Sequence, residues 1–234
     1  MRKVVTAAEM RELDRLTTER YAVPSPLLME AAASAAARFL SSHFPQGLSG
    51  LRALVLCGRG NNGGDGAALA RILWESGAAR VEVLLFGRVE EARGDARANF
   101  EIVSRLAGSH GDATDAVRHG AHGGADDNAS RDACEQPRLS FVECADADEC
   151  ARRLEAEPRP HVVVDALFGT GLTRPLEGVF AELISQLSAL RARSALRGAP
   201  QQRPGESKQP GDEPQPFILS LDLPSGLDAD SADT

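Results

Sequence analysis

The chain has no apolar run long enough to cross a membrane, which takes about 20 consecutive residues. It also lacks an apolar segment of the secretory type near its start, where residues 1–6 lead directly into an amphipathic helical pattern. Positive charge is in deficit, because 26 Lys and Arg stand against 34 Asp and Glu and give a net charge of −8. We therefore expect a cytoplasmic protein that is drawn neither to nucleic acid nor to an anionic membrane surface.

Cysteine is scarce as well. The four cysteines, Cys57, Cys134, Cys144 and Cys150, include no Cys-x-x-Cys pair. Their number excludes a disulfide scaffold and their spacing disfavours a zinc site, so we expect reduced thiols. What the chain does have is an ordinary globular composition, with 42% hydrophobic and 26% charged residues. Its length of 234 residues is usual for one α/β domain with surface insertions.

Hydrophobic patterning predicts two initial helices and then an alternation of strands and helices. Thr6 and Glu9 form a capping box for the first helix, and Ser25 is the expected N-cap of the second, with Pro26 as its first residue. This order predicts a parallel sheet with helices on both faces. The expected helices cover about 7–20, 26–40, 67–74, 93–106, 146–155 and 176–190, and the expected strands cover 53–57, 81–86, 141–144, 161–167 and 217–223.

Two stretches, about 108–138 and 192–216, break this alternation. They lack apolar periodicity and are rich in small or polar residues, so we interpret them as flexible surface insertions. His119 and His122 lie in the first insertion and are of a residue type that ligates metals, but a solvated low-complexity loop is the better interpretation.

The strongest local feature is a buried strand that ends at a glycine-rich segment, Gly58-Arg-Gly-Asn-Asn-Gly-Gly-Asp-Gly66, followed by a helix. Glycines allow close backbone approach, and the free N–H groups at a helix N-terminus bind anions such as a pyrophosphate. The segment therefore predicts a nucleotide-binding turn. Gly58, Gly60 and Gly63 also satisfy G-x-G-x-x-G, which by itself favours a dehydrogenase only weakly.

Two details oppose the dehydrogenase interpretation. The second strand ends in Leu85-Phe86-Gly87-Arg88, without the acidic residue that would hold a ribose, although Arg88 would suit a 2′-phosphate. In addition, Asp65 places a carboxylate at the expected helix N-terminus. There it would compete with a phosphate for the same N–H groups unless a cation or a hydroxyl intervenes.

Two more loops follow buried strands and should open on the same carboxyl edge of the sheet. Asp165 lies inside an otherwise apolar strand, Asp222 repeats this pattern in the last strand, and Gly169 to Thr173 offer N–H groups and hydroxyls suited to phosphate or ribose. A buried carboxylate needs a partner, so Asp165 is a candidate cation ligand or acid/base, or else a cap for local backbone N–H groups. With Asn62 and Ser225 it would offer only oxygen ligands, which suit a hard cation such as potassium, sodium or magnesium.

Three segments resemble the signatures of the YjeF N-terminal domain family, the NAD(P)H-hydrate epimerases. They are Gly60-Asn-Asn-Gly-Gly-Asp-Gly66, Val164-Asp-Ala-Leu-Phe-Gly-Thr-Gly171 and Ser220-Leu-Asp-Leu-Pro-Ser-Gly226, and Thr6 to Met10 and Leu28 to Glu30 fit the family as well. The resemblance covers the chain apart from the two insertions. It implies a Rossmann-like three-layer α/β/α fold and the interconversion of the R and S forms of hydrated NADH and NADPH (NADHX and NADPHX), a step that repairs damaged nicotinamide nucleotides.

Carried over motif by motif, the resemblance puts potassium ligands on Asn62, Asp165 and Ser225. Epimerisation at a ring carbon that bears a hydroxyl needs proton transfer, through ring opening or through loss and return of water, and Asp222 is the expected acid/base. The cation would hold Asp165 ionised and leave Asp222 freer to exchange a proton. The implied substrate contacts are Asn61, Asn62, Gly63, Gly64, Asp65, Gly169, Thr170, Gly171, Leu172, Thr173, Arg174, Pro175 and Asp222.

The expected partners are the small-molecule substrate, a second copy of the chain in a homodimer, and an ADP-dependent hydrate dehydratase, fused or separate. The chain also departs from the family in two places. Ala31 to Ala33 replace Asn-Ala-Gly in the second helix, and the chain stops at Thr234, where the family continues to further strands and a lysine-bearing segment. We therefore expect a single, C-terminally incomplete domain over residues 1–234, with an exposed sheet edge.

Three other functions compete with the epimerase. They are a non-catalytic nucleotide-binding or scaffold domain of the same family, an NADP-dependent oxidoreductase built on the three glycines and Arg88, and a folded domain whose glycines only make turns. No His, Tyr or Lys is placed to serve hydride transfer. Asp165 and Asp222 are both in place in their loops, which favours the epimerase.

Overall fold

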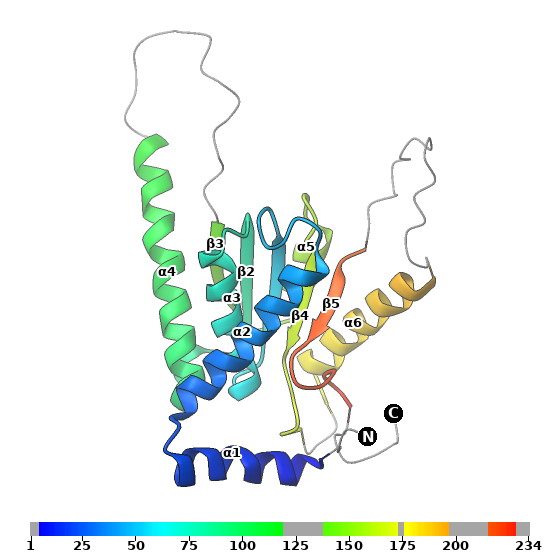
Figure 1. Cartoon of the computed structure of the whole chain (residues 1–234). Coiled ribbons are helices and arrows are strands. Elements are labelled where there is room, and N and C mark those ends of the chain that lie inside the picture. The colour runs from blue at the N-terminus through cyan, green and yellow to red at the C-terminus, as the bar shows by residue number, and fades with distance from the viewer. Residues whose placement is uncertain (1–4, 119–137, 173–175, 197–214, 228–234) are drawn as a thin grey trace, which may run out of the picture.

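The computed structural model describes residues 5–118, 138–172, 176–196 and 215–227. Within them, parallel strands form one sheet in the order β3-β2-β1-β4-β5 (Figure 1). The predicted parallel α/β architecture is therefore confirmed. The strands are β1 (Arg52–Cys57), β2 (Arg80–Phe86), β3 (Arg138–Cys144), β4 (Val162–Ala166) and β5 (Phe217–Ser220), and the helices are α1 (Ala7–Tyr21), α2 (Ser25–His43), α3 (Asn61–Glu75), α4 (Gly94–Arg118), α5 (Asp148–Glu155) and α6 (Val179–Leu196), with a short 3₁₀ helix at Val89–Glu91.

Helices cover both faces of the sheet because the strands are apolar on both sides. Side chains alternate along a strand, so Val55 packs with α2, α3 and α4, whereas its neighbour Leu54 packs with α5 and α6. Phe100 of α4 lies in the first core and Leu187 of α6 in the second, and both are fully buried. The result is the expected three-layer sandwich.

The order of the strands reverses at β1, since β2 lies on one side of it and β4 on the other. In open α/β sheets, ligands bind at the carboxyl ends of the strands where the order reverses. Here that point lies between β1, which the glycine-rich segment follows, and β4, which contains Asp165.

Helix α1 lies apart from the two packed layers, across the end of the sheet where the strands finish (Figure 1). Its predicted capping box is present: the Thr6 N–H donates to Glu9 Oε2 over 2.8 Å, and the Glu9 N–H donates to Thr6 Oγ1 over 3.2 Å. The Arg11 guanidinium donates to the carbonyl oxygen of Thr170 over 3.1 Å. This contact ties α1 to the loop after β4.

Several details of the predicted elements were wrong. Strand β5 ends at Ser220, so Asp222 lies in the turn after it rather than inside the last strand. Ser25 is not an N-cap but the first residue of α2, and its hydroxyl donates to the Asp95 carboxylate at the start of α4. Helix α4 continues to Arg118, so residues 108–118 are helical rather than part of an insertion. Helix α3 begins at Asn61, six residues before the predicted start at Ala67.

The predicted insertions were also wrong at Arg138, which begins β3, and at residues 192–196, which belong to α6. Residues 119–137 and 197–214, which include His119, His122 and Cys134, lie outside the described residues. Where the chain is described, no helix is both long and apolar enough to cross a membrane. The cysteines described, Cys57, Cys144 and Cys150, are buried free thiols, as expected. Burial raises the pKa of the Cys150 thiol to about 12, so it is no nucleophile near neutral pH.

Candidate active site

The glycine-rich segment is a turn of three residues followed by the first turns of α3, which corrects the prediction of a long loop. Sterics explain why this part of the helix is rich in glycine. A Cβ on Gly63 would lie 1.8 Å from the Gly58 carbonyl oxygen, and a Cβ on Gly66 would lie 2.6 Å from the Cβ of Ala166. Glycine therefore allows α3 to start directly against the ends of β1 and β4.

The first turn of α3 carries the N–H groups on which the anion-binding prediction rests. The Gly64 N–H donates to the Gly60 carbonyl oxygen over 3.1 Å and begins the helical ladder. The N–H groups of Asn61, Asn62 and Gly63 precede that bond and have no partner within the helix. Contrary to what the sequence suggested, Asp65 does not compete for these N–H groups, because it lies in the next turn rather than at the N-terminus.

Asp165 is fully buried in β4, and hydrogen bonds from the protein surround it. Its Oδ2 accepts from the Ser225 N–H over 3.0 Å and from the Ser220 hydroxyl over 3.1 Å, and its Oδ1 accepts from the Ser225 hydroxyl. Two of the three predicted potassium ligands are thus brought together. Through these bonds Asp165 holds the turn after β5 against the end of β4.

Arg191 of α6 is a member of this network that sequence reasoning missed. Its guanidinium donates to Asp165 Oδ2 over 3.1 Å and to the Ser220 hydroxyl over 2.8 Å. It therefore balances the buried charge of Asp165. No local signal marks Arg191, because it lies 26 residues from its partner, at the edge of a segment predicted to be an insertion.

Asn62 is the third predicted potassium ligand. Both polar atoms of its side chain are buried and have no hydrogen-bond partner among the described residues. A buried, unpaired amide costs about 1–3 kcal/mol, so Asn62 stays a candidate for contact with a bound group. An amide oxygen, a carboxylate and a hydroxyl are ligands that suit a hard cation. In the described part of the chain, no cluster of three or more His, Cys, Asp or Glu is suited to hold a metal ion.

Asp222 lies in the turn after β5, with its backbone in the left-handed region at φ 66°. Such a conformation is uncommon outside glycine and is found at sites where a side chain must be aimed. The Thr170 N–H donates to Asp222 Oδ2 over 2.7 Å, and a Cβ on Gly169 would lie 2.2 Å from the same oxygen. The absence of a side chain at Gly169 is therefore what admits the Asp222 carboxylate to this loop.

Asp65 projects from α3 into the same region. Burial raises its pKa from 3.8 to about 7, and the negative charges of Asp222 and of Asp14 on α1 add to the rise. Asp65 makes no hydrogen bond or ion pair with another described residue. The carboxylates of Asp14 on α1 and of Asp222 in the turn after β5 thus act on Asp65 of α3 at the carboxyl edge of the sheet.

The other predicted contacts lie close by or outside the described residues. Leu172 and Gly169 belong to one turn, in which the Leu172 N–H donates to the Gly169 carbonyl oxygen over 3.2 Å. Gly171 lies in the same turn and is exposed. Thr173, Arg174 and Pro175 lie outside the described residues.

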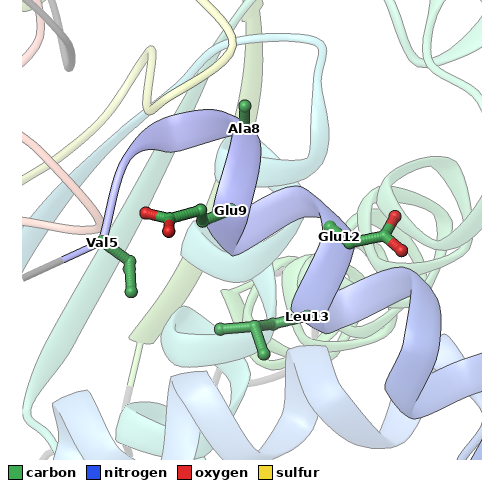
Figure 2. A pocket seen from close by; sticks show the side chains of 5 residues that line it. All are labelled: Val5, Ala8, Glu9, Glu12 and Leu13. Carbon is green, nitrogen blue, oxygen red and sulfur yellow. The ribbon is translucent and has the colours of Figure 1, made fainter.

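A separate pocket of about 420 Å³ lies on α1 and contains none of the predicted site residues (Figure 2). On a helix of 3.6 residues per turn, this lining falls on the face opposite Arg11 and Asp14, which are the α1 residues directed at the site. Helix α1 therefore presents one face to the carboxyl edge and another to solvent. The pocket is lined by Val5, Ala8, Glu9, Glu12 and Leu13.

The strand order and the helices on both faces of the sheet define a Rossmann-like α/β protein, with polar groups gathered where the strand order reverses. The family model described as YjeF-related protein N-terminus matches residues 25–234. The chain belongs to this family, as the three segments predicted.

Several curated relatives match over nearly the whole chain. A bifunctional NAD(P)H-hydrate repair enzyme of Moorella thermoacetica is 31% identical over 97% of this chain and 32% of its own length. An NAD(P)H-hydrate epimerase of Rhodopirellula baltica is 30% identical over 98% of this chain and 68% of its own length. The chain thus spans about a third of the bifunctional relative. The crystal structure of yeast ynu0, 22% identical, matches with a TM-score of 0.57 over 96% of this chain and 72% of that one, which supports the fold.

Proposed function

We propose that this chain is an NAD(P)H-hydrate epimerase that interconverts the R and S forms of NADHX and NADPHX. The observation that carries the proposal is the meeting of three loops at the β1/β4 switch point, where Asp222 bonds to Thr170 beside the glycine-rich start of α3. Relatives named NAD(P)H-hydrate epimerase align with 98% of the chain and support it.

In this proposal the pyrophosphate of the substrate lies at the N-terminus of α3, where the N–H groups of Asn61 to Gly63 bind it. The hydrated nicotinamide ring then extends toward the turn after β5. A hydrate of a dihydronicotinamide carries its hydroxyl on the carbon beside the ring nitrogen, because that nitrogen stabilises the cation to which water adds. Asp222 exchanges a proton at this hydroxyl, the role that the sequence predicts for it.

We also propose potassium as the cation of the site, held by Asn62, Asp165 and Ser225. The unpaired amide of Asn62 supports this, while Arg191 shares the charge of Asp165. A bound potassium ion would add positive charge beside the substrate's phosphate and hydroxyl groups. We expect potassium chloride to raise the melting temperature of the protein above its value in choline chloride of equal strength, and the Asn62→Ala variant to lose that increase.

The proposed partners follow from the relatives. Because the bifunctional enzymes are about three times as long as the matched region, we propose that the epimerase works beside an ADP-dependent dehydratase, fused or separate. The homodimer stays a prediction, and sedimentation would test it. Met10 and Leu13 of α1, which are 43% and 49% exposed, are the residues whose substitution by Ser we would try first.

The experiment that tests the function uses freshly prepared R-NADPHX with potassium and follows its conversion to the S form by chromatography. We expect conversion well above the spontaneous rate, and a return to that rate in the Asp222→Ala variant. Glu155→Ala removes an exposed carboxylate at the end of α5 and is the matched control. A folded wild-type protein that does not exceed the spontaneous rate would refute the proposal.

A further inference from the structure

Asp65 has a role that its place in a substrate-binding segment does not explain. Binding of an anionic nucleotide favours neutral or positive side chains nearby, yet Asp65 brings a carboxylate to the edge of the site. It is half-buried and has no hydrogen bond or ion pair with another described residue. Its charged neighbours are two further carboxylates, Asp222 and Asp14. A buried acid surrounded in this way is better suited to carry a proton than to remain ionised.

The nearby cations are engaged elsewhere. Arg11 of α1 donates to the Thr170 carbonyl oxygen, and Arg71, on the same helix as Asp65, pairs with Glu30 and Glu75. Arg191 bonds to Asp165 within the second core. None of these cations contributes to the electrostatics of Asp65 in the described part of the chain.

Asp222 differs from Asp65 in its surroundings. It is exposed, and the Thr170 N–H holds its Oδ2. Two neighbouring carboxyl groups in unlike environments divide the roles of acid and base between them. Resting on the proposed epimerase function, we propose that Asp65 is the general acid of the reaction and that Asp222 is the base.

The proposed epimerisation proceeds by loss and return of water. Asp65 donates its proton to the substrate hydroxyl, the carbon–oxygen bond breaks, the ring nitrogen forms a double bond to the carbon with its lone pair, and water leaves. Water then adds to the opposite face of that carbon and gives a proton to Asp222. Transfer of this proton from Asp222 to Asp65 restores the pair, so no external oxidant, reductant or acid is consumed.

Because the pKa of Asp65 lies at about 7, kcat/KM should fall as the pH rises through that value and Asp65 loses its proton. The Asp14→Asn variant removes one of the charges that raise this pKa, so the fall should move to lower pH. Glu19→Gln is the matched control, since it removes one negative charge from the same helix without acting on Asp65. A purely structural role for Asp65 would not produce this selective shift.

The test compares the Asp65→Asn variant with the wild type in epimerisation of R-NADPHX and in binding of NADPH as a probe. We expect kcat to fall about 100-fold or more while the NADPH affinity changes less than 10-fold. A variant with wild-type kcat, or a fall with pH that does not move in Asp14→Asn, would overturn the assignment of Asp65.

If the wild-type protein does not epimerise its substrate, the proposed function fails, and the proton on Asp65 is then tested alone. The carboxyl carbon of Asp65 is followed by ¹³C NMR from pH 3 to pH 9. A midpoint near 7 that falls in Asp14→Asn supports a protonated Asp65 at neutral pH, as the acid assignment requires. A midpoint below about 5, in the usual range of an aspartate, overturns it.

Discussion

The cost of keeping Asp65 in α3 should be measurable without any substrate. Its pKa is raised from 3.8 in the unfolded chain to about 7 in the folded protein, first because it is buried and then because of Asp222 and Asp14. The folded state therefore binds the proton more tightly than the unfolded state does. Below about pH 4 both states are protonated and Asp65 costs nothing, whereas above about pH 7 both are ionised and the full cost is present.

The magnitude follows from the same values. A rise of about three pH units, at about 1.4 kcal/mol per unit, corresponds to about 4 kcal/mol of lost stability at pH 8. Because Asp65 is only partly buried and solvent screens its charge, we expect about 2–4 kcal/mol. Asparagine has the same shape and no charge, so the Asp65→Asn variant should recover this amount at pH 8 and almost none of it at pH 4.

The assay is urea denaturation of the wild type and of Asp65→Asn at each pH unit from 4 to 8. The difference between their unfolding free energies should grow over the range where Asp65 ionises in the unfolded state but not in the folded one. Glu19→Gln, an exposed carboxylate paired with Arg15, should show no such growth. A difference for Asp65→Asn that is constant from pH 4 to pH 8 would refute the reasoning, whatever its size.

Two further predictions concern the packing around the site. A Cβ on Gly64 would lie 2.7 Å from the Cα of Ala96, so Gly64→Ala should lower the free energy of unfolding by about 1–3 kcal/mol in urea denaturation. Gly108 of α4 has open space around it, so Gly108→Ala should raise the same free energy by up to about 1 kcal/mol. Arg191→Met leaves the fully buried Asp165 without its cation and should cost about 3 kcal/mol, and less than half of that in an Asp165→Asn background. The first prediction is contradicted if Gly64→Ala is no more destabilising than Gly108→Ala. The second is contradicted if Arg191→Met costs the same free energy of unfolding in the wild-type and Asp165→Asn backgrounds.

The sequence predicted the arrangement of the sheet because its signals there are local. Each strand is a short apolar run, and the alternation with helices leaves few topologies other than a parallel sheet. The start of α3 was missed because glycine is normally unfavourable inside a helix. Here glycine is required inside the helix because Gly63 lies close to Gly58 and Gly66 lies close to Ala166. These contacts between segments cannot be read from the local sequence.

The same distinction holds for the site. The loops could be predicted because each follows a strand, and their shared edge follows from the parallel sheet. The role of Arg191 could not be predicted, because its ion pair with Asp165 depends on where α6 crosses the sheet. The different surroundings of Asp65 and Asp222 could not be predicted either. Asp14 lies 51 positions before Asp65 and Asp222 lies 157 positions after it, and only folding brings these residues near one another.

Asp165 shows why the two proposals for this site need different measurements. Its bonds to the Ser225 N–H and hydroxyl hold the turn that also carries Asp222, three residues earlier. Substituting Asp165 would therefore displace Asp222 whether or not a potassium ion is bound, and lost activity alone would not identify a cation ligand. The side chain of Asn62 makes no such bond to the part of the chain that the structure describes, so the loss of potassium-dependent stability in Asn62→Ala reports on the cation itself.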